Sequence, residues 1–382
     1  MPDATSATPA WIGPIAAQAG TVRHLYLHVP FCARVCPYCA FYVHQGGGQA
    51  QRAFASALAR EIGWARQAFD LRPETLYLGG GTPSLLPPES VEELFAALPA
   101  MDGEVTMEVN PATVTEAKAR AWKAAGINRI SLGAQSFDAD YLKLLGRDHR
   151  PQDIAETVAL LRAQGFDNIG IDLMFALPGQ PERVWRETLE QAIALQPEHI
   201  SSYALTYEED TPFLSRLKSG EWKQDEPREI AMFEEAFARL AGAGLPFYEV
   251  SNFARPGRES RHNRAYWLGA GYLGLGPSAY ATVGGARWQN VRDTARYVAQ
   301  VEAGRLPVEL AEREEFSPEI HLREKILFGL RMREGVPAAL LQGFEKPAQE
   351  AVEEGLAVWE EERLKLTPRG RLVADGVAGL FV

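Results

Sequence analysis

The sequence alternates short apolar runs typical of strands with amphipathic helical stretches, from residue 22 to about residue 253. The first run, residues 22–29, precedes a helical stretch at 52–69. Five further strand-like runs follow, each separated from the next by a helical pattern: 75–78, 104–109, 129–132, 168–175 and 199–206. Such alternation builds a parallel sheet with helices outside. Six units predict an α/β fold, a partial (β/α)6 barrel that is open on one side.

The alternation ends near Phe253, where a stretch rich in Pro, Gly and Arg leads into an aromatic and glycine-rich segment. From Ser317 helical patterns dominate, followed by a strand-like run at 363–366 and a last helix from Pro368. The sequence therefore predicts a small C-terminal domain, helical or winged-helix-like. The expected divisions are a flexible N-terminal tail (1–20), the barrel (21–253), a junction segment (254–316) and the C-terminal domain (317–382).

Charge and composition exclude several classes of partner. The formal net charge is −11 and no block of lysine or arginine occurs, so we expect no nucleic acid partner, even for a winged-helix-like domain. No apolar run approaches the roughly 20 residues of a transmembrane segment. The N-terminus also lacks the basic start and apolar stretch of a secretion signal. We therefore expect a cytoplasmic protein.

All three cysteines of the chain, Cys32, Cys36 and Cys39, lie in one short segment just past the first strand. An odd number in one loop fits no disulfide framework. Three thiolates could ligate three irons of a 4Fe-4S cubane and leave the fourth iron open to another ligand. A zinc site completed by His28 or His44 is the alternative, since closed zinc sites need four nitrogen or sulfur ligands.

Polar or flexible residues also stand at the ends of other predicted strands. Gly80 and Gly81 belong to a triglycine followed by Thr82, directly after the second strand, where missing side chains would let the backbone approach a ligand. Asp172 interrupts an apolar strand, and a buried carboxylate is costly unless a partner such as a ribose hydroxyl pair satisfies it. The alternative for the triglycine is a simple tight turn, and the alternative for Asp172 is a salt bridge within the barrel.

Three further candidates, Glu108, Gln135 and Arg147, lie at or just past strand ends. Because the carboxyl ends of parallel strands meet at one edge of a barrel, their side chains could together bind a zwitterionic nucleoside. Glu108 and Arg147 could instead simply pair with one another.

The cysteine spacing, with the aromatic Tyr38 before the last cysteine, resembles the radical S-adenosylmethionine (SAM) superfamily. The resemblance implies a 4Fe-4S cluster on the three cysteines, with SAM bound at the open iron. Within the superfamily, the chain resembles the branch of oxygen-independent coproporphyrinogen III oxidases and HemW heme chaperones. By that resemblance the SAM-binding residues are Tyr26, Tyr38, Gly80, Gly81, Thr82, Glu108, Gln135, Arg147 and Asp172.

Two features separate the oxidases from the chaperones. The oxidases carry a fourth cysteine two residues after the third, where this chain has Phe41, and they have a longer N-terminal extension. The segment from His262 to Trp267 reads His-Asn-Arg-Ala-Tyr-Trp and resembles the HNxxYW motif of HemW proteins, which implies heme binding by His262, Tyr266 and Trp267. Imidazole is a good axial ligand for heme iron, and aromatic rings can pack on the macrocycle.

The resemblance therefore implies a heme chaperone that binds the cluster, SAM and heme and delivers heme to client hemoproteins. A low-potential electron donor such as ferredoxin or flavodoxin, and a second copy of the chain in a homodimer, are the other implied partners. Three alternatives stay open at this point. They are a coproporphyrinogen III oxidase, a radical SAM enzyme with another substrate, and a structural protein stabilised by zinc.

Overall fold

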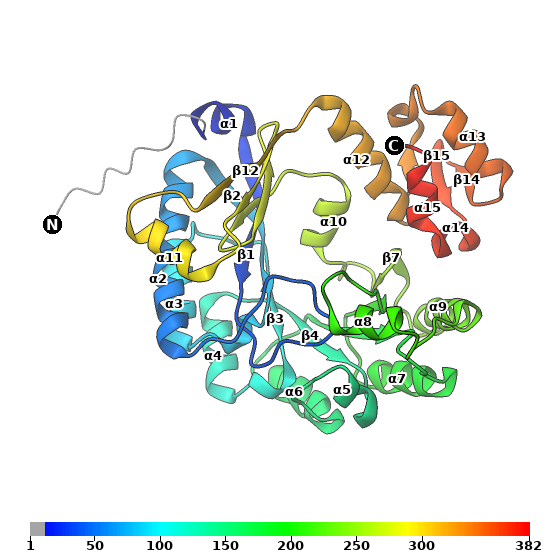
Figure 1. Cartoon of the computed structure of the whole chain (residues 1–382), viewed down its shortest axis with the longest axis horizontal. Coiled ribbons are helices and arrows are strands. Elements are labelled where there is room, and N and C mark those ends of the chain that lie inside the picture. Colours follow the sequence, from blue (N-terminus) through cyan, green and yellow to red (C-terminus); the bar gives the residue numbers. More distant parts are fainter. Residues whose placement is uncertain (1–11) are drawn as a thin grey trace. The chain divides into compact units, whose positions relative to one another are not determined.

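The computed structural model describes residues 12–382 (Figure 1). Their contacts group them into two compact units that are interleaved along the chain. Unit 1 contains the described residues up to Gly170 together with Thr206–Glu221 and Gly271–Glu315. Unit 2 contains Ile171–Leu205, Trp222–Ala270 and Phe316–Val382.

Parallel strands form the main sheet of unit 1, in the order β9-β1-β2-β3-β4. Their bounds are β1 Thr21–Val29, β2 Asp70–Gly80, β3 Glu104–Val109, β4 Arg129–Gln135 and β9 Leu273–Leu275. The strands predicted at these first four positions are confirmed. The three-residue strand β9, which pairs with β1, was not predicted because it is too short to carry a recognisable period.

Helices connect the strands of unit 1 and cover the outer face of its sheet (Figure 1). They are α2 Gly48–Ala68, α3 Pro88–Ala97, α4 Glu116–Ala125, α5 Ala139–Leu144, α6 Pro151–Ala163 and α11 Thr294–Glu302. Unit 1 also contains the short helix α8 Pro212–Lys218. Helix α2 buries Phe54, Leu58 and Ile62, which recur every four residues and so form one stripe. Burial of this stripe against the sheet supplies much of the core of unit 1.

The two faces of the sheet differ in chemistry. Along β1, Leu25, Leu27 and Val29 are fully buried, whereas the alternate positions hold Tyr26 and His28. Successive side chains of a strand point to opposite faces, so one face is apolar and packs on the helices, and the other is polar. A polar inner face is available to hold a polar ligand.

The N-terminal part of the chain differs from the expected flexible tail. Residues Ile12–Ala19 form helix α1, and Ile12 and Ile15 are buried. The helix contacts strand β10 of a small antiparallel sheet, made of β10 Tyr280–Val283, β11 Ala286–Asn290 and β12 Val308–Glu315. The rest of the expected tail lies outside the described residues.

A buried carboxylate ties α2 to the later part of unit 1. Glu61 accepts hydrogen bonds from the Gly276 backbone amide (2.9 Å), the Asn290 side-chain amide (2.7 Å) and the Tyr297 hydroxyl (2.6 Å). Burial raises the pKa of Glu61 despite these donors. Three donors from separate elements fix the end of β9 beside β1.

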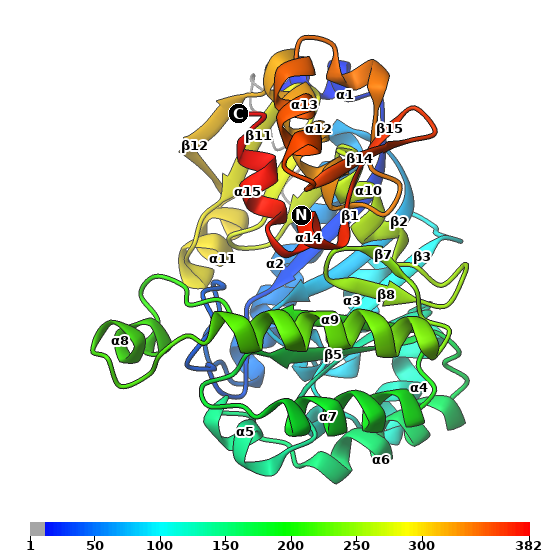
Figure 2. The same ribbon diagram turned by 90° about the vertical axis from the view of Figure 1, so that its right-hand side faces the viewer.

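Unit 2 contains the last two strands of the barrel pattern, β5 Ile169–Phe175 and β6 His199–Ala204, although the first two residues of β5 belong to unit 1. The antiparallel strands β8 Asn252–Ala254 and β7 Phe247–Glu249 continue the order after β6. Helices α7 Glu182–Ala194 and α9 Glu226–Gly242 run side by side (Figure 2). The buried Trp185 indole on α7 donates to the Met232 carbonyl of α9 at 2.8 Å. The strands predicted for β5 and β6 are confirmed.

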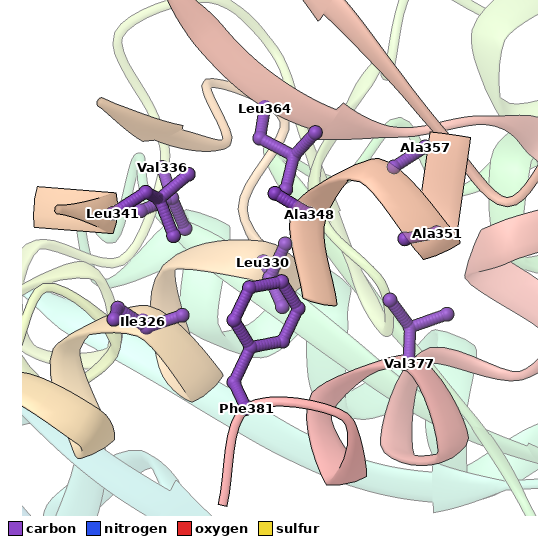
Figure 3. Close-up of a cluster of buried hydrophobic side chains, with 10 residues drawn as sticks. All are labelled: Ile326, Leu330, Val336, Leu341, Ala348, Ala351, Ala357, Leu364, Val377 and Phe381. Carbon is purple, nitrogen blue, oxygen red and sulfur yellow. The ribbon is translucent and has the colours of Figure 1, made fainter. Parts of the chain in front are cut away.

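The C-terminal part of unit 2 has its own apolar core. It consists of helices α12 Pro318–Arg331, α13 Glu345–Glu353, α14 Pro368–Leu372 and α15 Ala374–Gly379 and strands β13 Val336–Pro337, β14 Ala357–Glu360 and β15 Arg363–Leu366. Leu330, Leu364 and Phe381 are among the buried side chains that meet between these elements (Figure 3). This confirms the predicted small C-terminal domain, which combines helices with a three-stranded antiparallel sheet.

Candidate functional site

The three cysteines lie on the loop between β1 and α2, and backbone hydrogen bonds close the neck of that loop. The Cys32 amide donates to the His44 carbonyl (2.9 Å), and the His44 amide donates to the Pro30 carbonyl (2.8 Å). Inside the loop the Cys39 amide donates to the Cys36 carbonyl at 3.1 Å, which forms a turn between two of the thiols. The neighbouring strand contributes as well, because the Thr82 amide donates to the Phe31 carbonyl (2.7 Å).

Each thiol is half-buried, and two of them have a polar neighbour. The Thr82 hydroxyl lies 3.5 Å from the Cys32 sulfur, and an Arg147 guanidinium nitrogen lies 3.9 Å from the Cys36 sulfur. Burial raises the pKa of Cys32 to about 11 and also raises the pKa of Cys39. A neutral thiol is therefore favoured unless a metal stabilises the thiolate, as iron of a cluster does.

Arg147 is placed between the cysteine loop and β4. One guanidinium nitrogen donates to the Gly133 carbonyl at 2.8 Å, and the buried Nε has no partner among residues 12–382. The same guanidinium approaches the Cys36 sulfur, so the side chain joins the cysteine loop to the end of β4. A buried N–H without a partner costs free energy, which an anionic ligand group at this position would offset.

The arrangement fits a cluster better than a single zinc ion. Both ring nitrogens of His28 are engaged, with the Tyr26 hydroxyl (3.0 Å) and the Tyr42 carbonyl (2.9 Å). Those of His44 lie 2.7 Å from the Thr294 hydroxyl and 2.8 Å from the Gln45 carbonyl. Within residues 12–382 no three Cys, His, Asp or Glu side chains are gathered around one ion position. In a cubane each cysteine binds a different iron, so its sulfurs need not converge on one point.

The triglycine at the end of β2 is required because neighbouring parts of the chain lie too close for a side chain. A Cβ on Gly80, whose φ is +104°, would lie 2.5 Å from the His28 ring, and a Cβ on Gly81 would lie 2.7 Å from the Phe31 carbonyl oxygen. A Cβ on Gly79 would meet Glu108 at 3.0 Å. Glycine at all three positions lets this strand end pass directly beside the start of the cysteine loop.

The inner face of the sheet brings Tyr26, Glu108 and Gly80 together. The Tyr26 and Tyr77 rings stack with centroids 6.3 Å apart, and the Tyr77 hydroxyl donates to Glu108 at 2.9 Å. The other Glu108 oxygen accepts from the Gly80 amide at 3.2 Å. Burial, followed by the Glu108 charge, raises the pKa of Tyr26 well above its ordinary value. A carboxylate and a phenol thus lie together at the strand ends, with hydrogen-bonding groups for a polar ligand.

Gln135 and Tyr38 flank the same loop region. Gln135, the last residue of β4, has a φ of +66°, and its amide nitrogen lies 3.1 Å from where a Cβ on Gly133 would stand. Tyr38 packs its ring on Phe213 of α8 with centroids 6.0 Å apart, and the Phe213 amide donates to the Pro37 carbonyl at 3.3 Å. Burial and the neighbouring Cys36 raise the pKa of Tyr38. Tyr38 therefore supports the loop from within.

Asp172, on β5 of unit 2, is partly exposed and accepts a hydrogen bond from the Ser201 hydroxyl of β6 at 2.6 Å. The costly buried carboxylate that the sequence suggested is thus already bonded to a neighbouring strand.

The predicted heme residues lie on or beside helix α10, Arg261–Trp267, also in unit 2. The Ser260 hydroxyl caps the helix by accepting from the Asn263 amide (3.2 Å). Tyr266 is 39% exposed, whereas Trp267 is partly buried against a cluster of Tyr248, Ala254 and Met332. The two aromatics of the motif therefore differ, since Tyr266 offers surface and Trp267 serves mainly to pack.

Sequence reasoning missed several supporting residues, chiefly Tyr77, Phe213 and Thr294. Tyr77 stands two residues before the triglycine, so the strand period places it on the inner face, and this signal was available. Phe213 and Thr294 lie far from the cysteines in sequence and reach the loop only through the fold. No local pattern marks them.

The fold and the cysteine loop define a radical SAM protein. Residues 26–192 match the family model "Radical SAM superfamily", and residues 316–373 match the model "HemN C-terminal domain". The chain belongs to the HemW heme chaperone family. It is 36% identical over 380 residues to the heme chaperone HemW of Mycobacterium tuberculosis (strain ATCC 25618 / H37Rv), which covers 97% of both chains. It is 32% identical to HemW of Bacillus subtilis (strain 168), over 94% of this chain and 99% of that protein.

The comparisons extend to a mitochondrial protein and to a solved structure. The chain is 34% identical to radical S-adenosyl methionine domain-containing protein 1, mitochondrial, of Bos taurus, over 87% of this chain and 74% of that protein. It resembles the structure of coproporphyrinogen III oxidase (HemN) from Escherichia coli with a TM-score of 0.84 at 22% identity, over 98% of this chain and 93% of that one. At this identity the likeness confirms the fold. No helix within residues 12–382 is long and apolar enough to cross a membrane.

Proposed function

We propose that this protein is a heme chaperone that holds a 4Fe-4S cluster and SAM in its barrel, binds heme, and delivers the heme to client hemoproteins. The observation that carries the proposal is the full-length similarity to HemW heme chaperones, joined to a cysteine loop that fits a cluster. Cys32, Cys36 and Cys39 would hold the cluster. When bound, cluster and SAM together supply one-electron chemistry at the barrel mouth.

The residues around the loop suit the charged groups of SAM. Arg147, with its unpartnered buried Nε, can pair with a carboxylate, and Glu108 can accept from an ammonium group. Tyr26 and Gln135 add a phenol and an amide, while Gly80, Gly81 and Thr82 let the backbone come close. We assign Asp172 to the ribose hydroxyls, because one carboxylate can accept from two neighbouring O–H groups.

For heme, the proposal assigns His262 as the axial ligand and Tyr266 as the ring that packs on the macrocycle. Trp267, which meets the Tyr266 ring edge-on, would support that ring. The implied partners are client hemoproteins, a low-potential donor such as ferredoxin or flavodoxin, and a second copy of the chain.

An oxygen-independent coproporphyrinogen III oxidase is the second candidate, favoured by the likeness to the HemN fold. Against it stands Phe41, which occupies the position of the fourth cysteine of the oxidases and is 71% exposed on the cysteine loop. A phenyl side chain cannot replace a thiol, since it neither ligates metal nor transfers a proton.

Anaerobic reconstitution followed by heme titration tests the proposal, with coproporphyrinogen III turnover assayed in the same samples. Wild type should bind about one heme per chain without turnover, and His262→Ala should bind at least about tenfold more weakly through loss of the axial ligand. His24→Gln is the matched control, because His24 bonds to Thr75 on β2 in the other unit. Turnover without specific heme uptake would make the protein an oxidase.

A further inference from the structure

Helix α12 of the C-terminal domain packs against neighbouring elements on two of its faces. Ile326 and Leu330 point into the C-terminal core (Figure 3). Lys325, Phe328 and Arg331 recur every three residues, so they share another side of the helix. Phe328 and Arg331 contact residues of α10, and Lys325 lies beside Gly269, two residues beyond the end of that helix.

Aromatic contacts join α10 to this second face. The Tyr266 ring stacks on Phe328 with centroids 5.2 Å apart and an interplanar angle of 29°. Trp267 meets Phe328 edge-on at 5.6 Å, and Tyr266 and Trp267 meet edge-on at 5.1 Å. The three rings form a closed triad, in which each pair has a stacked or edge-to-face geometry that aromatic rings favour.

Charged groups secure the same interface. The Arg331 guanidinium lies over the Trp267 ring at 4.9 Å and pairs with Asp375 at 3.0 Å. Arg264 of α10 pairs with Glu334 at 2.9 Å. Beyond the helix, Gly269 has a φ of +71°, and a Cβ there would lie 2.6 Å from the Lys325 stem. Contacts therefore run from Arg264, in the middle of α10, to Gly269 beyond its end.

Helix α10 has little stability of its own. It is seven residues long and contains no buried residue. Helices this short are marginal in water, so neighbouring elements must determine where its side chains point. Because His262 and Tyr266 are four residues apart, they share one face of the helix, and whatever orients Tyr266 also orients His262.

We infer that Phe328, supported by Arg331 and Glu334, is a positioning residue for the heme site, so that the C-terminal domain holds the His-Asn-Arg-Ala-Tyr-Trp helix in its binding orientation. This inference rests on the proposed function, because it concerns the same heme site. It assigns the C-terminal domain a part in heme binding that acts through the orientation of α10.

The test is heme titration of the full-length reconstituted protein by absorption spectroscopy, with the Soret band position as a second readout. Phe328→Leu keeps an apolar side chain but removes the ring, and it should weaken heme binding about tenfold and shift the Soret band. Phe328→Tyr, which keeps the ring, should restore wild-type affinity and spectrum. The position of the Soret band reports how the heme iron is ligated. A general loss of stability would lower the amount of bound heme but would not shift this band.

Phe344→Leu is the matched control. Phe344 is an aromatic residue of the same domain that packs on Phe381 and Arg323, away from α10. This variant should bind heme as wild type does. Glu334→Gln, which weakens the ion pair with Arg264 near the surface, should cost about two- to threefold in affinity and serves if Phe328→Leu does not fold.

The outcomes separate the two proposals. If wild type takes up heme but Phe328→Leu and Glu334→Gln match it in affinity and spectrum, the positioning role is wrong and the heme site stands. If Phe344→Leu weakens binding as much as Phe328→Leu, the effect comes from domain stability and the inference also fails. If wild type takes up no heme, or His262→Ala binds normally, the assignment of the heme site itself is wrong.

Discussion

Single side chains in the cysteine loop have separable roles, because the thiols are the candidate cluster ligands while the backbone closes the loop. Cys32, Cys36 and Cys39 were predictable from sequence, since three cysteines in one loop permit few interpretations. The environment of the thiols was not predictable. Thr82 follows β2 and Arg147 lies between α5 and α6, so only the fold brings them to the sulfurs.

Replacing one thiol should remove the cluster without unfolding the barrel. In Cys36→Ala one iron loses its protein ligand, so iron and sulfide per chain should fall to near zero, while far-UV circular dichroism stays unchanged. Val35→Ala is the control, since Val35 is an exposed apolar neighbour in the same loop. A full complement of iron in Cys36→Ala would contradict the ligand assignment.

His149 should make stability depend on pH. Its Nε2 lies 3.1 Å from the Ala134 carbonyl, Nδ1 is buried without a partner among the described residues, and burial together with the Arg147 charge lowers its pKa from 6.5 to about 4. The folded state therefore resists protonation that the unfolded state accepts. The stabilisation is complete above pH 6.5 and is lost as the pH falls through this window to about 4.

The variant His149→Gln keeps a donor for Ala134 but cannot titrate. Between pH 6.5 and 4, wild type should lose about 2–3 kcal/mol more unfolding free energy than this variant. Urea denaturation at a series of pH values measures the difference. Parallel pH curves for the two proteins would show that His149 titrates normally in the folded state.

At the scale of elements, the end of β2 illustrates what sequence patterns can and cannot show. The triglycine was visible in the sequence, but the second strand is longer than predicted, since β2 runs to Gly80 and includes two of the three glycines. The packing partners of the triglycine were not visible, because His28 and the Phe31 carbonyl come from β1 and the cysteine loop. Periodicity reports which face a side chain takes, whereas close approaches between strands depend on register and twist.

The variant Gly80→Ala should therefore damage both stability and SAM binding. Its positive φ alone costs about 1 kcal/mol or more, and the new Cβ would also displace the His28 ring, which bonds to Tyr26. Gly179→Ala isolates the first effect, since Gly179 has a φ of +68° but open space around its Cβ. Chemical denaturation and SAM titration should show Gly80→Ala as the more severe change by about 1–2 kcal/mol.

At the scale of the whole molecule, sequence and structure divide the chain differently. The sequence pattern suggests consecutive segments, whereas contacts group the described residues into two interleaved units. Local periodicity identifies each strand and helix, but it carries no information about which elements pack together. For this reason β9, which lies far along the chain from β1 and pairs with it, could not be predicted from the sequence pattern.

The C-terminal core should be separable from the cluster site in its response to mutation. Leu364→Ala removes a fully buried side chain of β15 and should destabilise unit 2 by about 2–5 kcal/mol. Iron content should not change, because all three cysteines lie in unit 1. Calorimetry and iron analysis measure the two effects. Val358→Ala, at an exposed position of β14, is the control, and loss of iron in Leu364→Ala would disprove the separation.

The closed neck of the cysteine loop has a consequence for how the cluster is assembled. Two backbone hydrogen bonds between Pro30–Cys32 and His44 join the ends of the loop without using any thiol. The entropy cost of bringing those ends together is therefore met by folding of the barrel and not by arrival of iron. Because the loop is closed without the cluster, loss of the cluster should leave the loop in place. We therefore expect the cluster to be lost and rebuilt reversibly while the barrel stays folded.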